Sequence, residues 1–325
     1  MFRYFGGNTK SFYYGHICFL ALQVVIGVRT VLFQRQPKND KIIRHFLEPL
    51  LLFENRITHN DLQISEESKV KIEDQAKKLF KINQFNLISF SGQWFLSSTV
   101  MTLWKFDWQR SPFVTTFSVL HYWFFIFYCF GSHLIGLTYF YIISKVCEAK
   151  ISYLKEELDS YESYTLYTNV KLLTRHSDVC RSVSMYNKYW KHYISTMIGS
   201  FVPLISLVCY MAFISDNPLV LKGLFLLACP AFMILLSFVV LCAAKVSKDL
   251  IRTHRQLLVI HNHVLKSKKS QVQWILTKLR RIKRVLIRFE LPITIGFSCG
   301  DLFYVSYQTY ADVSLISHLI NTYVN

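Results

Sequence analysis

The chain has 325 residues, of which 52% are hydrophobic and 16% aromatic, and a formal net charge of +17. So large an apolar share, with a mean hydropathy of +0.27, is unusual for a soluble domain of this size. A nucleic-acid binder would gather its positive charge on a soluble domain, whereas here the charge falls between long apolar runs. The pattern predicts an all-α integral membrane protein, a bundle of helices that crosses the bilayer several times.

Six apolar runs have roughly the 20 helical residues that one bilayer crossing requires. In chain order these expected spans are about 12–33, 84–104, 112–143, 193–213, 219–243 and 303–325. The first run is too long for the apolar core of a secretory signal and shows no clear small-residue cleavage site, so it is interpreted as a retained span. We therefore expect a single transmembrane helical domain over 1–325.

Positive charge sets the expected orientation. The segments 34–83, 144–192 and 244–290 hold 10, 8 and 13 of the 37 Lys and Arg residues. Positive residues near spans are retained on the cytoplasmic side, so these three segments are expected to be cytoplasmic. The short connections 105–111 and 215–218, together with both chain ends, are then extracellular. An extracellular C-terminus is opposite to the orientation of a G-protein-coupled receptor.

Two charged segments contain apolar residues at helical spacing. One stripe has spacings of 4, 3, 4 and 3, and the other has spacings of 3, 4, 3, 4 and 3 among basic residues. They are Cys147, Ile151, Leu154, Leu158 and Tyr161, and then Val272, Ile275, Leu279, Ile282, Leu286 and Phe289. Three interpretations remain open: packing within one subunit, an assembly interface between subunits, and a site for calmodulin or anionic lipid.

Polar side chains enter the last apolar run in two sets. Asp301, Gln308 and Asp312 fall on nearly one helical face, and Ser314, His318 and Asn321 share another. Ionisable residues in a span are costly and face protein or water. The sets are therefore expected either to bond to neighbouring helices or to line a wet pathway whose acids favour cations.

No enzyme signature is present in the sequence. The eight cysteines form no CxxC pair and indicate neither a metal site nor a disulfide framework. The stretch His261-Asn262-His263 has no accompanying carboxylate pattern, so a metal role is not expected. The sequence also lacks a phosphate-binding GxxxxGK loop and a nucleophile elbow. We expect neither a catalytic residue nor a cofactor.

Several stretches resemble the insect gustatory and odorant receptor superfamily. RHFLEPLLLFENRI (44–57) is similar to the family's first cytoplasmic loop, and CEAKISYLKEELDS (147–160) to the extension of its fourth span. SCGDLFYVS (298–306) resembles the segment that opens the last helix, and Thr322-Tyr323 the start of the terminal signature. The layout of spans and loops resembles the family over most of the chain.

The resemblance implies a seven-span chemoreceptor that forms a tetrameric ligand-gated cation channel from identical or related subunits. A nucleic-acid partner is not expected, because the positive charge falls between the apolar runs. It implies that the last helix lines the pore, with candidates Gln308, Asp312, Ser314, His318 and Asn321, and that cytoplasmic helices join the subunits. The implied ligand, a small organic tastant, would bind between the outer halves of spans. Candidate pocket residues are Trp104, His121, Tyr122, Trp123 and Tyr210. An aromatic belt at the membrane interface is the other interpretation of these aromatic residues.

The chain departs from the family pattern at both ends. The sequence stops two residues after Tyr323, so the Gln-Phe half of the signature is absent, and the run at 12–33 matches the family's second span. The chain is therefore interpreted as a divergent or shortened gustatory receptor of the plasma membrane of sensory neurons. A G-protein-coupled receptor, or a transport or scaffold protein without gating, is the alternative.

Overall fold

The structure is a computed structural model of the whole chain, and four long helices make up most of what it describes. The described residues are 21, 24–28, 48–59, 61–105, 116, 120, 128, 131–160, 166–214, 219–267, 296–299 and 303–306. The long helices are α3 (Glu66–Lys105), α5 (Gly131–Asp159), α6 (Leu166–Cys209) and α7 (Leu219–Ser267). A π-helical turn, η2 (Tyr210–Ile214), continues α6.

Each long helix joins an expected cytoplasmic segment to an expected span without interruption. Helix α3 runs from the charged residues 66–83 into the apolar residues 84–105, and α7 runs from the apolar residues 219–243 into the charged extension. The change from charged to apolar residues does not interrupt the helices, because the hydrogen bonds of a helix lie within its own backbone, whatever surrounds it. At the start of α3, the Ser65 hydroxyl accepts a hydrogen bond from the Ser68 backbone N–H (3.2 Å) and caps the first turn.

Two helical segments among the described residues are long and apolar enough to cross a membrane. They are Tyr167–Ile214 and Phe225–His263, with apolar windows of mean hydropathy 2.1 and 2.7. They contain the expected spans 193–213 and most of 219–243. Most of the expected spans 12–33 and 303–325 lies outside the described residues, so the number of spans and their orientation remain predictions from the sequence.

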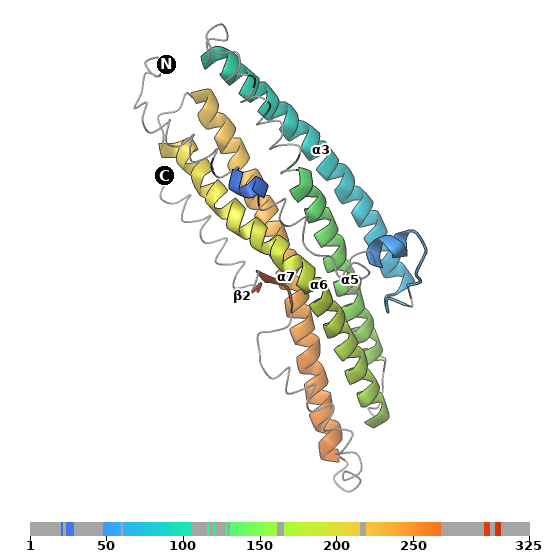
Figure 1. Cartoon of the computed structure of the whole chain (residues 1–325). Helices are drawn as coiled ribbons and strands as arrows, with labels where there is room; N and C mark the ends of the chain where they lie inside the picture. Colours follow the sequence, from blue (N-terminus) through green and yellow to red (C-terminus); the bar gives the residue numbers. More distant parts are fainter. Residues whose placement is uncertain are drawn as a thin grey trace.

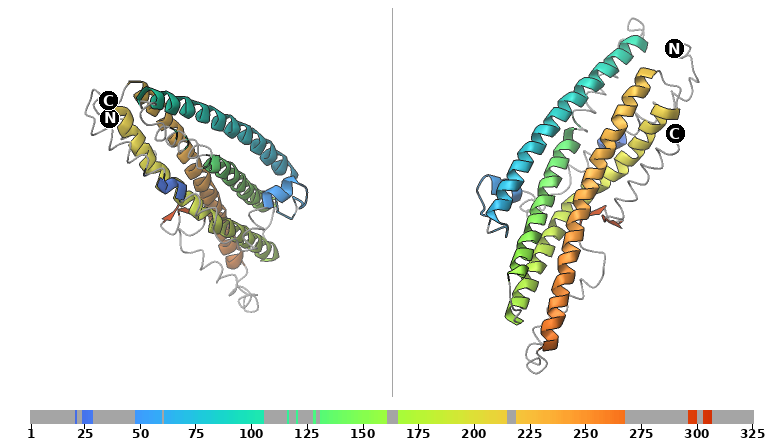
Figure 2. Two further views of the ribbon diagram at one scale, coloured as in Figure 1. Left: turned by 45° about the horizontal axis from the view of Figure 1, so that its top comes forward. Right: turned by 180° about the vertical axis from the view of Figure 1, so that it is seen from behind.

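The four helices form an elongated bundle (Figure 1). Helix α3 packs against α5, and α5, α6 and α7 all contact one another. Figure 2 shows α3 lying along one side of the bundle, while α6 and α7 cross each other at an angle. The main core lies where α5, α6 and α7 meet, and it is rich in aromatic side chains.

The start of the last apolar run differs from the expected helix. A short antiparallel hairpin of β1 (Ser298–Cys299) and β2 (Phe303–Tyr304) pairs Ser298 with Tyr304 and Cys299 with Phe303. The expectation that a helix begins at about residue 303 is therefore wrong for residues 303 and 304, which form a strand, and residues 305 and 306 are not helical either. Short apolar runs suit a strand as well as a helix, and here contacts with α6 and α7 favour the extended form.

Candidate functional site

The β1–β2 hairpin is attached to α6 by one asparagine side chain. The Asn187 amide oxygen accepts a hydrogen bond from the Ser298 backbone N–H (2.8 Å), and its amide nitrogen donates to the Ser298 hydroxyl (3.1 Å). Two bonds from one side chain fix the position and the orientation of the strand that they join. Asn187 therefore fastens the segment before residues 307–325 to the middle of the bundle.

A glycine and a phenylalanine fit the hairpin against α7 and α5. Gly296 has a φ of +137°, where L side chains are strained, and an added Cβ would lie 2.0 Å from the Ser247 hydroxyl on α7. Phe297 is fully buried, with its ring centroid 5.1 Å from that of Phe140 on α5. The Val305 backbone N–H donates to the Phe297 carbonyl (2.8 Å) and closes the hairpin. We call these contacts, with those of Asn187, the hairpin junction.

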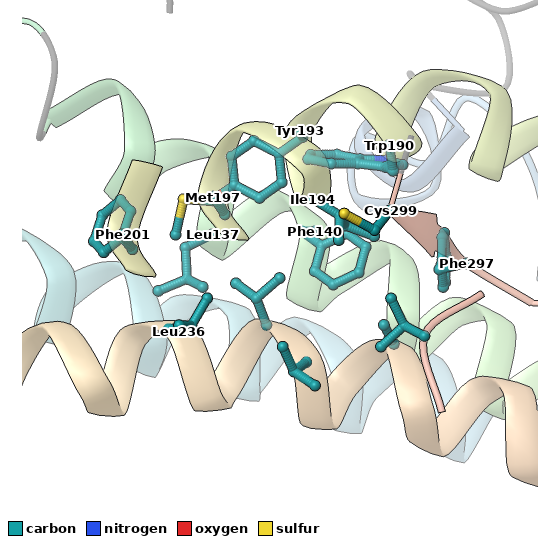
Figure 3. Packing of buried hydrophobic residues seen from close by; sticks show 14 of the residues in the cluster. Leu137, Phe140, Trp190, Tyr193, Ile194, Met197, Phe201, Leu236, Phe297 and Cys299 are labelled. Carbon is teal, nitrogen blue, oxygen red and sulfur yellow. The ribbon is translucent and has the colours of Figure 1, made fainter. Parts of the chain in front are cut away.

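A row of aromatic side chains extends from the hairpin junction along α6. Figure 3 shows Phe297 at one end of the row, Trp190 and Tyr193 in the middle, and Phe201 at the other end. The Trp190 ring centroid lies 5.2 Å from that of Phe140 and 5.1 Å from that of Tyr193. The Tyr193 hydroxyl donates to the backbone carbonyl of His133 (2.9 Å). Rings packed this closely leave no free space between them, so displacement of one ring displaces its neighbours.

A buried ion pair joins the segment at residues 48–53 to α5 and α6. The Lys150 ammonium lies 3.8 Å from a Glu48 carboxylate oxygen, and the two side chains are only 7% and 13% exposed. The Tyr186 hydroxyl donates to the same carboxylate, and the Lys150 ammonium lies 5.7 Å from the centre of the Tyr186 ring. Because charges out of water require partners, these three groups fix one another in place.

A second acid, Glu148, joins α5 to α7. Its carboxylate accepts hydrogen bonds from the Lys145 ammonium on its own helix and from the Lys245 ammonium on α7, both at 2.8 Å. The Glu148 side chain is 15% exposed. One carboxylate shared by two ammonium groups leaves a net positive charge. Such a charge suits the cytoplasmic boundary that the sequence predicts near residue 144.

The apolar stripe that begins at Cys147 packs inside the subunit. Leu154 and Leu158 are buried against Leu172 and Leu173 of α6 and Leu257 of α7. Cys147 and Ile151 are buried in the main core. Of the three interpretations of that stripe, internal packing is confirmed for these four residues.

The histidines of the stretch 261–263 do not form a metal site with their described neighbours. The Asn169 amide nitrogen lies 2.9 Å from His261 Nδ1, across the contact of α6 with α7. No group of three or more His, Cys, Asp or Glu side chains within the described ranges is placed to hold a metal ion. His261 therefore serves as a buried polar contact between helices.

The structure places only a few of the site residues predicted from sequence. Tyr210 is the first residue of η2, half-buried and packed against the main core. Trp104 lies in the last turn of α3, where the backbone but not the side chain is described. The remaining candidates lie outside the described residues, and their roles stay predictions: His121, Tyr122, Trp123, Gln308, Asp312, Ser314, His318, Asn321, Thr322, Tyr323 and the stripe from Val272 to Phe289.

Sequence reasoning missed the polar residues that join the elements. Glu48 was one signal, because it is the only acid in the otherwise apolar stretch 46–53. Lys150 was another, because it follows Cys147 by three residues and so falls on the buried face of its helix. Asn187 gave no such signal, since its partner Ser298 lies 111 residues away.

Comparison with known proteins gives a match of fold. No family model matches the sequence, and no curated protein matches it. Among solved structures, the chain is similar to the insect olfactory receptor OR5 from Machilis hrabei, with a TM-score of 0.57 and 14% identity. The similarity covers 94% of this chain and 77% of the receptor. The chain therefore shares the fold of this insect olfactory receptor over nearly its whole length.

Proposed function

We propose that this chain is a chemosensory receptor of the insect chemoreceptor superfamily, and that it acts as a subunit of a ligand-gated cation channel. The observation that carries the proposal is the fold that nearly the whole chain shares with an insect olfactory receptor. The two long apolar helical segments support a membrane protein. An enzyme is not supported, because the fold match is to a receptor and the sequence has no catalytic motif.

The hairpin junction suggests how ligand binding reaches the pore in such a channel. The hairpin immediately precedes residues 307–325, which hold the candidate pore residues. It is attached to α6 through Asn187 and packs against α5 through Phe297. A ligand that shifted α5 or α6 would displace the hairpin, and with it the start of the last run. Communication through packed side chains of this kind needs only shifts of about 1–2 Å.

The finer assignment is a gustatory-type receptor for small organic tastants. The segments 44–57, 147–160 and 298–306 resemble segments of the insect gustatory and odorant receptor superfamily, and the chain is most similar to a divergent or shortened gustatory receptor. We propose a tetramer of identical or related subunits in the plasma membrane of sensory neurons, held together by the stripe from Val272 to Phe289. The proposed pocket includes Tyr210, which lies half-buried where α6 approaches α7.

Sidedness tests this proposal against a G-protein-coupled receptor. An epitope tag after Asn325 should stain on intact cells, because the proposed channel has an extracellular C-terminus. A tag inserted at 215–218 should also stain on intact cells, whereas a tag at 161–165, between α5 and α6, should need permeabilisation. A C-terminal tag that stains only after permeabilisation would overturn the proposed orientation.

Electrical recording then separates a channel from a transport or scaffold protein. The purified protein is reconstituted in planar bilayers with potassium chloride at different concentrations on the two sides. A channel should give unitary currents that reverse near the potassium equilibrium potential, since Asp312, the acid proposed for the pore, favours cations. Bilayers that contain intact, correctly oriented protein and carry no unitary current, with or without a panel of small organic compounds, would favour the scaffold.

A further inference from the structure

Two cysteines meet across the helices that flank the connection at 215–218. The sulfur atoms of Cys209 and Cys229 lie 3.1 Å apart. Cys209 is the last residue of α6 and is buried, while Cys229 lies on α7 and is half-buried. A disulfide bond has an S–S length of about 2.05 Å, so the two sulfurs need to approach by only about 1 Å. Neither α6 nor α7 has to unfold for so small a movement.

The chain connection keeps this pair together. The two cysteines are 20 residues apart, and η2 with the connection at 215–218 joins their helices directly. The π-helical turn contacts both α6 and α7 and begins at the residue after Cys209. Within one subunit, each sulfur therefore finds the other without any contribution from a second chain.

The surroundings of Cys209 and Cys229 differ from those of a purely structural cysteine. Cys147 is fully buried in the main core, and burial raises the pKa of its thiol to about 12. A thiol of that kind packs as a small apolar group and reacts slowly. Cys229, in contrast, is partly exposed and has a second sulfur in contact. That second sulfur can complete an oxidation that begins at either cysteine.

We propose that Cys209 and Cys229 are a redox-modification site that closes an intramolecular disulfide between α6 and α7. The oxidant is a small neutral peroxide, such as hydrogen peroxide, which can reach sulfur atoms inside an apolar bundle. One cysteine sulfur attacks a peroxide oxygen, the O–O bond breaks, and a sulfenic acid and one water form. The second sulfur then attacks the sulfenic sulfur, the S–O bond breaks, and a second water leaves. Two electrons and both thiol protons pass to the peroxide, so one peroxide consumes two thiols.

The disulfide would join α6 to α7 next to the π-helical turn. Sliding of one helix along the other by a fraction of a turn, which is a common form of conformational change, would then be blocked at this point. The site does not depend on the proposed channel function, since it needs only the contact between the two sulfurs.

Peptide mapping of the purified full-length chain tests the site. Trypsin cleaves after Lys191, Lys222 and Lys245, which places Cys209 in peptide 192–222 and Cys229 in peptide 223–245. The folded protein is treated with hydrogen peroxide, its free thiols are alkylated, and it is digested without reductant. The expected product is the two peptides joined, with a mass two hydrogens below their sum. Treatment with a phosphine reductant should separate them.

The variants define what the linked product means. Peptide 223–245 also contains Cys242, so Cys242→Ser is the matched control and should leave the linked product unchanged. Cys209→Ser and Cys229→Ser should each abolish it, and size-exclusion chromatography shows whether these variants stay folded. A linked product that is present before peroxide treatment also supports the site. The proposal is overturned if wild-type and Cys242→Ser proteins both remain alkylated at Cys209 and Cys229 after peroxide treatment, or if the link involves Cys242.

Discussion

Replacement of Gly296 by alanine tests the hairpin junction most directly. The residue has a φ of +137°, and an added Cβ would lie 2.0 Å from the Ser247 hydroxyl oxygen and 2.8 Å from the Ser247 Cβ. A non-glycine residue in so sparsely populated a conformation costs about 1–3 kcal/mol. Overpacking of a tight contact costs about 1–3 kcal/mol more. Gly296→Ala should therefore destabilise the protein by about 2–6 kcal/mol, a large part of the 5–15 kcal/mol that is typical of folded domains.

Thermal unfolding of the detergent-purified protein measures this effect. Gly296→Ala should lower the midpoint by several degrees, and Ser247→Ala should restore part of the loss because it removes the oxygen that the new Cβ meets. The restoration cannot be complete, since the backbone strain and the contact with the Ser247 Cβ remain. A double-mutant cycle should give a favourable coupling of about 0.5–3 kcal/mol, the range for residues in contact.

Two other glycines provide matched controls. An added Cβ at Gly92 on α3 or at Gly223 on α7 would meet no atom within 4 Å. Alanine is favoured over glycine inside a helix by about 1 kcal/mol, so Gly92→Ala and Gly223→Ala should be neutral or stabilising. A melting midpoint for Gly296→Ala that matches these controls would refute the close approach of the hairpin to α7.

Three further changes test other parts of the reasoning. Lys150→Met should cost about 3–5 kcal/mol because it removes an ammonium group that lies beside the buried Glu48 carboxylate, and adding Glu48→Gln should recover much of that loss in thermal unfolding. Leu279→Asp combined with Leu286→Asp should shift the oligomer toward monomer in size-exclusion chromatography with light scattering. An unchanged profile would mean that this stripe packs internally. Asp312→Asn should lower conductance or alter cation preference in bilayer recordings while surface expression is kept; identical currents would show that Asp312 does not line the pore.

Periodicity predicted the parts of the fold that depend on one helix at a time. The spacing of Cys147, Ile151, Leu154 and Leu158 indicated one buried face, and all four side chains are buried. This succeeds because residues three and four apart lie on the same side of any α-helix, whatever its neighbours. The same spacing did not decide among the three interpretations of the stripe. The choice depends on which element covers that face, and in the structure residues of α6 and α7 cover Leu154 and Leu158.

The charged residues show a second limit of sequence reasoning. Positive charge between apolar runs predicted cytoplasmic segments, and this prediction treats each Lys as solvated. Lys150 is instead buried beside Glu48, and Glu148 is shared by lysines of two helices. Such residues still carry the net charge on which orientation depends, but they also hold helices together. Charge counting records the first role, whereas the second depends on contacts between distant parts of the chain.

The pair Cys209 and Cys229 illustrates why contacts between helices could not be predicted from the sequence. If α6 and α7 left the connection at 215–218 in step, the residue opposite Cys209 would be about residue 224, as near to the connection as Cys209 is. Its partner is Cys229, which lies five residues further along α7 and so about 7.5 Å further along the helix axis. The offset belongs to the way in which α6, its π-helical turn and α7 pack against one another. No spacing rule within the sequence contains that offset, so the sequence suggested eight unrelated cysteines where the fold brings two of them into contact.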